Sequence, residues 1–151
     1  ESFFGSLSKI DILSSFNDIE HNFIKDASIV SGDKFYPHPN NLRAATDGMQ
    51  DTYAAGVDGK FPYLIDFVWD KKISVYRISF DWYSISENSR DYEVYIDKGS
   101  GYELISAGRK FAYYARGDYV LSSTVGISKL RIIFNSAPGQ NRILLREIGV
   151  Y

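Results

Sequence analysis

Residues 91–97 decide the fold, and they read Asp-Tyr-Glu-Val-Tyr-Ile-Asp. Tyr92, Val94 and Ile96 fall on every second position, and the positions between them carry polar or amphipathic side chains. Because successive side chains of a β-strand point to opposite faces, this alternation predicts a strand with one buried face. The glycine-rich segment 97–101 follows at once and is typical of a tight hairpin turn.

Other segments rich in β-branched and aromatic residues continue this pattern on both sides. They are Ala27–Val30, Tyr63–Trp69, Ile73–Trp82, Tyr102–Ser106, Asp118–Ser123, Lys129–Asn135 and Ile143–Tyr151. Turn signals between them lie at Gly108, Arg116-Gly117, Gly126 and Ala137-Pro138-Gly139-Gln140. Many short strands without an alternating helical pattern predict an all-β antiparallel sandwich of about eight strands.

The period-two pattern also predicts which side chains lie between the sheets. The expected core residues are Tyr92, Val94, Ile96, Leu130, Ile132, Phe134, Leu144, Ile148 and Val150. The N-terminal part is less regular. Residues 1–31 form a lead-in in which Ser6–Phe23 fits either a weak helix or extended chain, and Gly32–Leu42 reads as a loop. We expect a single domain over residues 1–151.

Composition excludes several classes of function. The 151 residues contain no cysteine, so a disulfide framework and a cysteine-ligated zinc are excluded. The 17 basic and 19 acidic residues give a net charge of −2, which argues against nucleic acid or an anionic membrane as partner. Apolar runs are only a few residues long, so no membrane insertion is expected. The chain begins at Glu1 rather than Met, and we expect a processed chain or a domain of a longer protein.

Three segments in a fixed order carry a family resemblance. An Asp47-Gly48 turn leads to Thr52, then comes Pro62–Phe67, and the chain ends on Arg146–Tyr151. With the strand at residues 91–97, this order resembles the discoidin domains, also called coagulation factor 5/8 type C domains. Within them it is closest to the family-32 carbohydrate-binding modules. The resemblance covers residues 32–151 and implies a jelly-roll sandwich of the galactose-binding type.

The sequence departs from the family pattern in two places. Ala54 stands where the family usually has a tryptophan, with Tyr53 one position earlier. The turn at residues 97–101 lacks the usual Ser-x-Asp-Gly, although its glycines still allow a positive φ.

The resemblance implies a structural Ca²⁺ where the early loop meets the last strand. Hard oxygen ligands suit this ion, and an Asp-Gly turn followed by a threonine supplies them compactly. The implied side-chain ligands are Asp47, Thr52 and Glu147, and the implied backbone carbonyls are those of Ala44, Met49 and Arg146. The alternative is that Asp47-Gly48 is only a turn and Glu147 only an exposed strand residue.

Aromatic and hydrogen-bonding residues gather in the predicted loops. A sugar presents flat apolar faces and radiating hydroxyl groups, so its sites combine an aromatic platform with a few polar side chains. The candidates are His38, Tyr83, Glu87, Asn88, Arg90, Tyr113, Tyr114, Arg116, Asn141 and Arg142. Of the adjacent tyrosines, we expect Tyr114 to be exposed and Tyr113 to pack inward. The alternative is that these rings belong to ordinary sheet packing.

Signatures of catalysis are absent from the sequence. Its two histidines, His21 and His38, stand in no metal-ligand pairing, and there is no nucleophile elbow and no phosphate loop. The tripeptide Arg116-Gly117-Asp118 matches an integrin-binding sequence, but we read it as a turn that leads into the next strand.

The function that we predict is therefore non-catalytic recognition of a glycan. The domain would target a larger secreted or surface protein, and its location would be extracellular, on a cell surface or on a virion surface. The alternative is an assembly module of a phage tail or virion surface protein that binds other chains and no sugar, since aromatic residues also anchor protein interfaces. A phospholipid-binding discoidin domain is disfavoured by the net charge.

Overall fold

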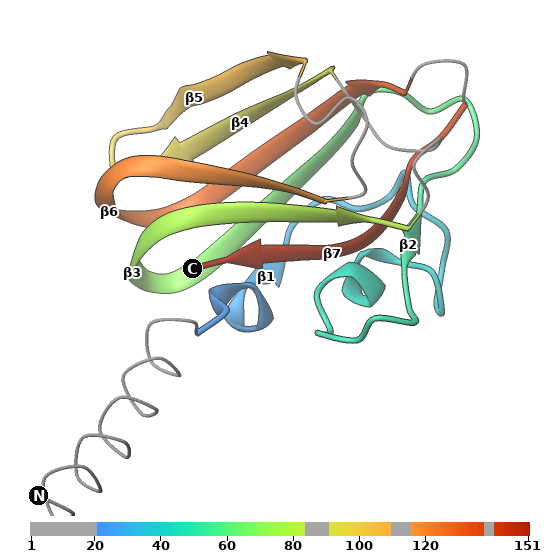
Figure 1. The fold of residues 1–151 in the computed structure, drawn as a ribbon, viewed down its shortest axis with the longest axis horizontal. Helices are drawn as coiled ribbons and strands as arrows, with labels where there is room; N and C mark the ends of the chain where they lie inside the picture. Colours follow the sequence, from blue (N-terminus) through green and yellow to red (C-terminus); the bar gives the residue numbers. More distant parts are fainter. Residues whose placement is uncertain (1–20, 84–90, 110–115, 138–140) are drawn as a thin grey trace, which may run out of the picture.

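Two long paired strands form the frame of the molecule. The computed structural model describes residues 21–83, 91–109, 116–137 and 141–151, with the backbone alone at 107–109 and 116–120. Strands β3 (Tyr63–Trp82) and β6 (Arg116–Ser136) pair antiparallel along nearly their whole length. Register shifts after Val68 and Val75 interrupt the ladder. Figure 1 shows both strands curving back at this point, so each contributes one half to each layer.

The remaining strands extend the two halves of this ribbon into two layers. In the first layer, β4 pairs with the second half of β6, β5 pairs with β4, and β1 pairs with β3. In the second layer, β7 pairs with the second half of β3, and β2 pairs with β7. The bounds are β1 Ser28–Ile29, β2 Ala54–Ala55, β4 Asp91–Asp97, β5 Tyr102–Arg109 and β7 Leu144–Val150, with 3-10 turns η1 Phe23–Asp26 and η2 Leu42–Ala45.

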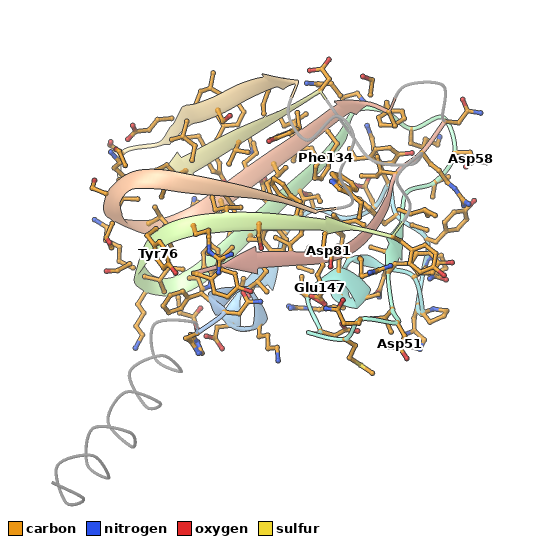
Figure 2. The ribbon with its side chains drawn as sticks, viewed as in Figure 1. Asp51, Asp58, Tyr76, Asp81, Phe134 and Glu147 are labelled. Atoms are coloured by element: carbon orange, nitrogen blue, oxygen red, sulfur yellow. The ribbon has the colours of Figure 1, made fainter. Side chains whose placement is uncertain are left out.

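Aromatic side chains fill the space between the layers. Phe80 and Trp82 come from the second half of β3, whereas Phe134 comes from the end of β6 and belongs to the first layer. The ring of Phe134 meets that of Trp82 at 5.3 Å and that of Phe80 at 5.8 Å, both edge to face. All three side chains are fully buried, and Figure 2 marks Phe134 in the interior. Such pairs stabilise the fold beyond the area that they bury.

The predicted core and fold class are confirmed. All nine side chains expected between the sheets are buried, and the most exposed of them, Leu144, is only 5% accessible. The described strands are antiparallel and form a two-layered sandwich. Among the described residues, no helix has the length and apolar character needed to cross a membrane.

Several predicted strand limits are wrong. Tyr63–Trp69 and Ile73–Trp82 are the two halves of β3, and the predicted strands on either side of Gly126 are both parts of β6. The ladder between β3 and β6 continues through the bend, because bulges change the direction of the strands without a turn. The two-residue strand β2 was not predicted, since Ala54–Ala55 carries no β-branched or aromatic side chain.

Two predicted glycine turns are also wrong. Gly108 lies inside β5 opposite Tyr92, and Gly117 lies inside β6 opposite Phe80. The tripeptide 116–118 is therefore the start of a strand and not a turn. Glycine permits a turn but does not impose one, and here the backbone pairs in the ladder instead.

The lead-in packs against the sandwich from residue 21 onward. Ile24 in η1 is fully buried. The side-chain oxygen of Asn22 accepts hydrogen bonds from the backbone N–H of Ile24 and of Val150, which ties η1 to β7. The prediction for Ser6–Phe23 falls mainly on residues 1–20, which lie outside the described residues.

The aromatic contact between the layers gives a stability test. We expect Phe134→Ala to lower the free energy of unfolding by about 3–5 kcal/mol, because it removes a fully buried ring and leaves a cavity. Leu104→Ala is the control, since Leu104 is 52% exposed and should change stability by no more than about 0.5 kcal/mol. Urea denaturation of both variants measures the difference, and equal losses would contradict this account of the core.

Candidate functional site

The loop after η2 brings several oxygen atoms together. The Thr52 hydroxyl lies 2.7 and 3.0 Å from the two carboxylate oxygens of Asp47. The same hydroxyl lies 3.2 Å from the Ala44 carbonyl oxygen and 3.5 Å from that of Met49. Four of the six predicted calcium ligands therefore meet within the segment 44–52.

Glu147 reaches this loop from β7. The backbone N–H of Gly48 donates to its carboxyl oxygens at 2.7 and 3.3 Å. Gly48 has a φ of 77°, and a side chain there would also meet the Lys25 ammonium at 3.0 Å, so glycine is required. Figure 2 shows Glu147 beside this loop. The sixth predicted ligand, Arg146, directly precedes Glu147 in β7.

The two carboxyl groups of this site perturb each other. Burial, together with hydrogen bonding and charge repulsion from Asp47, raises the pKa of Glu147 to about 8. Burial also acts to raise the pKa of Asp47, but hydrogen bonds from Met49 N–H, from Thr52 and from Glu147 outweigh it, so that the pKa is lowered. Without a cation, the pair therefore shares one proton near neutral pH.

The donor set fits a hard cation. Carboxylate, hydroxyl and carbonyl oxygens are the ligands of Ca²⁺, and a doubly charged ion would replace the shared proton. Within the described ranges, no three or more Asp, Glu, His or Cys side chains are grouped so that they could hold a metal. The site would thus depend on Thr52 and the backbone carbonyls as much as on its two acids.

A second group of predicted residues lies at one end of the sandwich. The strand ends that carry the three predicted ligand loops are neighbours in the ladder: Asp91 faces Arg109 and Ser136, and Asp81 faces Arg116. All three loops therefore leave from the same edge of the fold, which lies at the right in Figure 1. We call this edge the loop end.

Tyr83 is an exposed aromatic residue at the loop end. Its side chain is 44% accessible and stacks on Tyr53, with ring centroids 4.1 Å apart and planes at 26°. The Arg146 guanidinium lies 5.5 Å from the Tyr83 ring centroid. Sequence reasoning noted Tyr53 only as the neighbour of a missing tryptophan, because nothing in the sequence reveals that it meets Tyr83.

Three other predicted residues belong to the same end. Arg142 has its Nε 3.8 Å from the Asp58 carboxylate, and the backbone oxygen of the exposed Asn141 accepts from Gly59 N–H at 2.8 Å. His38 is exposed on a loop whose residue Asn40 accepts from Ala55 N–H of β2. Because β2 pairs with the start of β7, this loop also lies at the loop end.

The other predicted ligand residues fall in segments beyond the described ranges. Glu87, Asn88, Arg90, Tyr113 and Tyr114 lie outside the described residues, and so does the side chain of Arg116. The expectation that Tyr114 is exposed and Tyr113 packs inward therefore stays a prediction.

Comparison with known proteins identifies the class of fold. No protein-family model and no curated protein matches this sequence. Among solved structures, chitosan-binding module 1 of a chitosanase/glucanase from Paenibacillus sp. IK-5 superposes with a TM-score of 0.72 at 16% identity, over 87% of this chain and 98% of that one. CBM32-1 from a family 31 glycoside hydrolase of Clostridium perfringens gives 0.73 at 15% identity, with the same coverage.

A third match includes a bound sugar. The CBM32-1 and CBM32-2 domains of Clostridium perfringens ZmpB in complex with GalNAc superpose with a TM-score of 0.73 at 16% identity, over 93% of this chain and 37% of that one. The chain thus has the fold of the discoidin-like family-32 carbohydrate-binding modules, and the resemblance is confirmed for the fold.

The pKa of Glu147 predicts a pH dependence in the metal-free protein. Its folded-state pKa lies above the ordinary value of 4.5, so the folded state binds the proton more tightly than the unfolded state. In the presence of a chelator, the proton on Glu147 should contribute its full amount to the free energy of unfolding below about pH 4.5. This contribution should be lost as the pH rises to about 8. Glu147→Gln should lack it, and denaturation of both proteins across this range measures the difference. Identical pH profiles would contradict the assignment.

Proposed function

We propose that this chain is a non-catalytic carbohydrate-binding module whose sugar site is the loop end. The observation that carries the proposal is the exposed Tyr83 ring, stacked on Tyr53 where the predicted ligand loops converge. A ring held by a second ring offers a fixed apolar face, which suits the flat face of a sugar. The shared fold with modules described as binding chitosan or holding GalNAc supports the same class of ligand.

Polar groups around this ring supply the hydrogen bonds that a sugar needs. The Arg146 guanidinium lies 5.5 Å from the Tyr83 ring centroid. Arg142 and Asn141 lie at the same end, and an arginine fork can donate to two neighbouring hydroxyl groups at once. The proposed chemistry is recognition and not catalysis, in keeping with the fold shared with carbohydrate-binding modules. As part of a larger secreted or surface protein, such a module would target that protein to glycans.

We also propose a structural Ca²⁺ bound by Asp47, Thr52 and Glu147, with the carbonyls of Ala44, Met49 and Arg146 completing the site. Two observations support this proposal. Oxygen atoms of Ala44, Asp47 and Met49 surround the Thr52 hydroxyl. The same loop is linked to β7 by the hydrogen bond from Gly48 N–H to the Glu147 carboxyl group. The ion would neutralise two facing carboxylates and fix the loop to the last strand.

Calcium should stabilise the folded chain. At a hundredfold excess over its dissociation constant, Ca²⁺ should add about 2.7 kcal/mol to the free energy of unfolding, since it binds the folded state alone. Asp47→Ala should abolish the effect. Asp51→Ala is the matched control, because Asp51 is exposed in the same loop and is not a predicted ligand. Thermal unfolding with calcium and with chelator tests this, and an unchanged melting temperature in the wild type would remove the ion from the proposal.

Sugar binding should depend on the loop end. A glycan array first selects the sugar, and titration calorimetry then compares the wild type with Tyr83→Ala and Arg142→Ala. We expect a wild-type binding free energy of roughly −4 to −6 kcal/mol, so that loss of the stacked ring abolishes measurable binding. Tyr83→Trp keeps an aromatic face and should retain binding.

Circular dichroism of each variant controls for folding. If no glycan binds and the wild type forms a tight oligomer that Tyr83→Ala disrupts, the alternative of an assembly module is correct and the sugar proposal is wrong.

A further inference from the structure

A polar cavity of about 180 Å³ lies on the outer face of the second layer, and neither Tyr83 nor Arg142 of the loop end lines it. Its floor is formed by β3 and β7, and the segments at Asn22 and at residues 48–50 form its sides. The volume is well above the roughly 10–15 Å³ that a cavity needs on the same measure to hold one water, so the cavity has room for a small ligand.

Ser79 is a buried hydroxyl that lines this cavity. Its neighbours in β3, Ile78 and Phe80, point into the core, so Ser79 points outward. Even so, Ser79 is only 7% exposed, and its hydroxyl makes no hydrogen bond to a described residue. The hydroxyl opens into the cavity, where it can hydrogen-bond to a ligand.

Gly149 keeps the cavity open beside this hydroxyl. A Cβ on Gly149 would lie 2.5 Å from the Ser79 oxygen and 2.6 Å from the Tyr151 ring. Its backbone needs no positive φ, so space alone explains the glycine. Any side chain here would fill the cavity.

Asp81 gives the cavity a negative charge. It lies opposite Glu147 in the ladder between β3 and β7, and Figure 2 shows the two side chains near each other. Asp81 makes no ion pair or hydrogen bond to a described residue and is not one of the proposed calcium ligands. Among the described side chains, no lysine or arginine lines the cavity. The Lys25 ammonium approaches Gly48 at its edge, where it interacts with Glu147.

We propose that this cavity binds the ammonium group of an amino sugar. The Asp81 carboxylate and the Ser79 oxygen accept hydrogen bonds from the ammonium group. The Tyr151, Asn22 and Gln50 side chains on the remaining walls suit the hydroxyl groups of the ring. This site is separate from the loop end and does not depend on the function proposed for it.

Sugars that differ only at the amino position test the proposal. Glucosamine is titrated into the whole chain by NMR at mildly acidic pH, where the amine is protonated, with N-acetylglucosamine and glucose as neutral controls. We expect glucosamine to shift the signals of residues around the cavity and to bind at least about tenfold more tightly than either control. Equal affinity for all three sugars, or no binding of glucosamine, would overturn the proposal.

Three variants assign the binding to one of the two sites. Asp81→Asn keeps the shape and removes the charge, Gly149→Ala fills the cavity, and Tyr83→Ala alters only the loop end. Glucosamine affinity should fall at least about tenfold in the first two and stay unchanged in Tyr83→Ala. If Gly149→Ala does not fold, Asp81→Asn alone decides. Loss of binding in Tyr83→Ala with full binding in Asp81→Asn would place the sugar at the loop end and refute this site.

Discussion

The antiparallel pairing of β3 with β6 is the constraint on which the rest of the structure depends. Each strand is long enough to cross the molecule twice, and the register shifts after Val68 and Val75 let the pair bend without breaking. Bending brings Phe80 and Trp82 in one half of β3 against Phe134 in the opposite half of β6. The aromatic contact and the bend therefore support each other, because neither layer could bury its inner face alone.

The same bend explains why the candidate sugar residues meet. Since the ribbon folds back, both ends of β3 and both ends of β6 lie at one edge of the sandwich. β7 starts there as well, opposite Trp82, which brings Asn141 and Arg142 toward Tyr83. Loops on a rigid scaffold are a common place for recognition, and here the scaffold determines which loops are neighbours.

The last strand connects the proposed sites physically. In β7, the Arg146 guanidinium lies over the Tyr83 ring, and the Glu147 carboxyl group accepts a hydrogen bond from Gly48 N–H. Two residues later, Gly149 leaves space for the polar cavity. In the early loop, Thr52 of the candidate calcium site directly precedes Tyr53 of the aromatic pair. An ion bound by Thr52 and Glu147 would thus also fix the position of Tyr53, on which Tyr83 stacks. Metal binding and sugar binding would then be coupled through Arg146 and Glu147 in β7 and through Thr52 and Tyr53 in the early loop.

Local sequence pattern was sufficient to locate most strand segments, their buried face and the loop that carries the candidate metal ligands. Alternation at Tyr92, Val94 and Ile96 follows from the geometry of a single strand, so local pattern is sufficient to predict it. Asp47 and Thr52 lie within one loop, so their contact could also be expected from the sequence and the resemblance. Glycines such as Gly117 misled the prediction of strand ends, because the partner strand decides whether a permissive residue turns or pairs.

Only the tertiary structure decided which distant residues meet. The stacking of Tyr53 on Tyr83 and the pairing of Asp81 with Glu147 join segments that are far apart in the chain. No periodicity in the sequence encodes these contacts, because they depend on where the β3–β6 ribbon bends and on how β7 aligns against it. Ser79 is an outward-facing strand residue by its position in the sequence. In the structure it is 7% exposed and lines a cavity together with Tyr151 and Asn22.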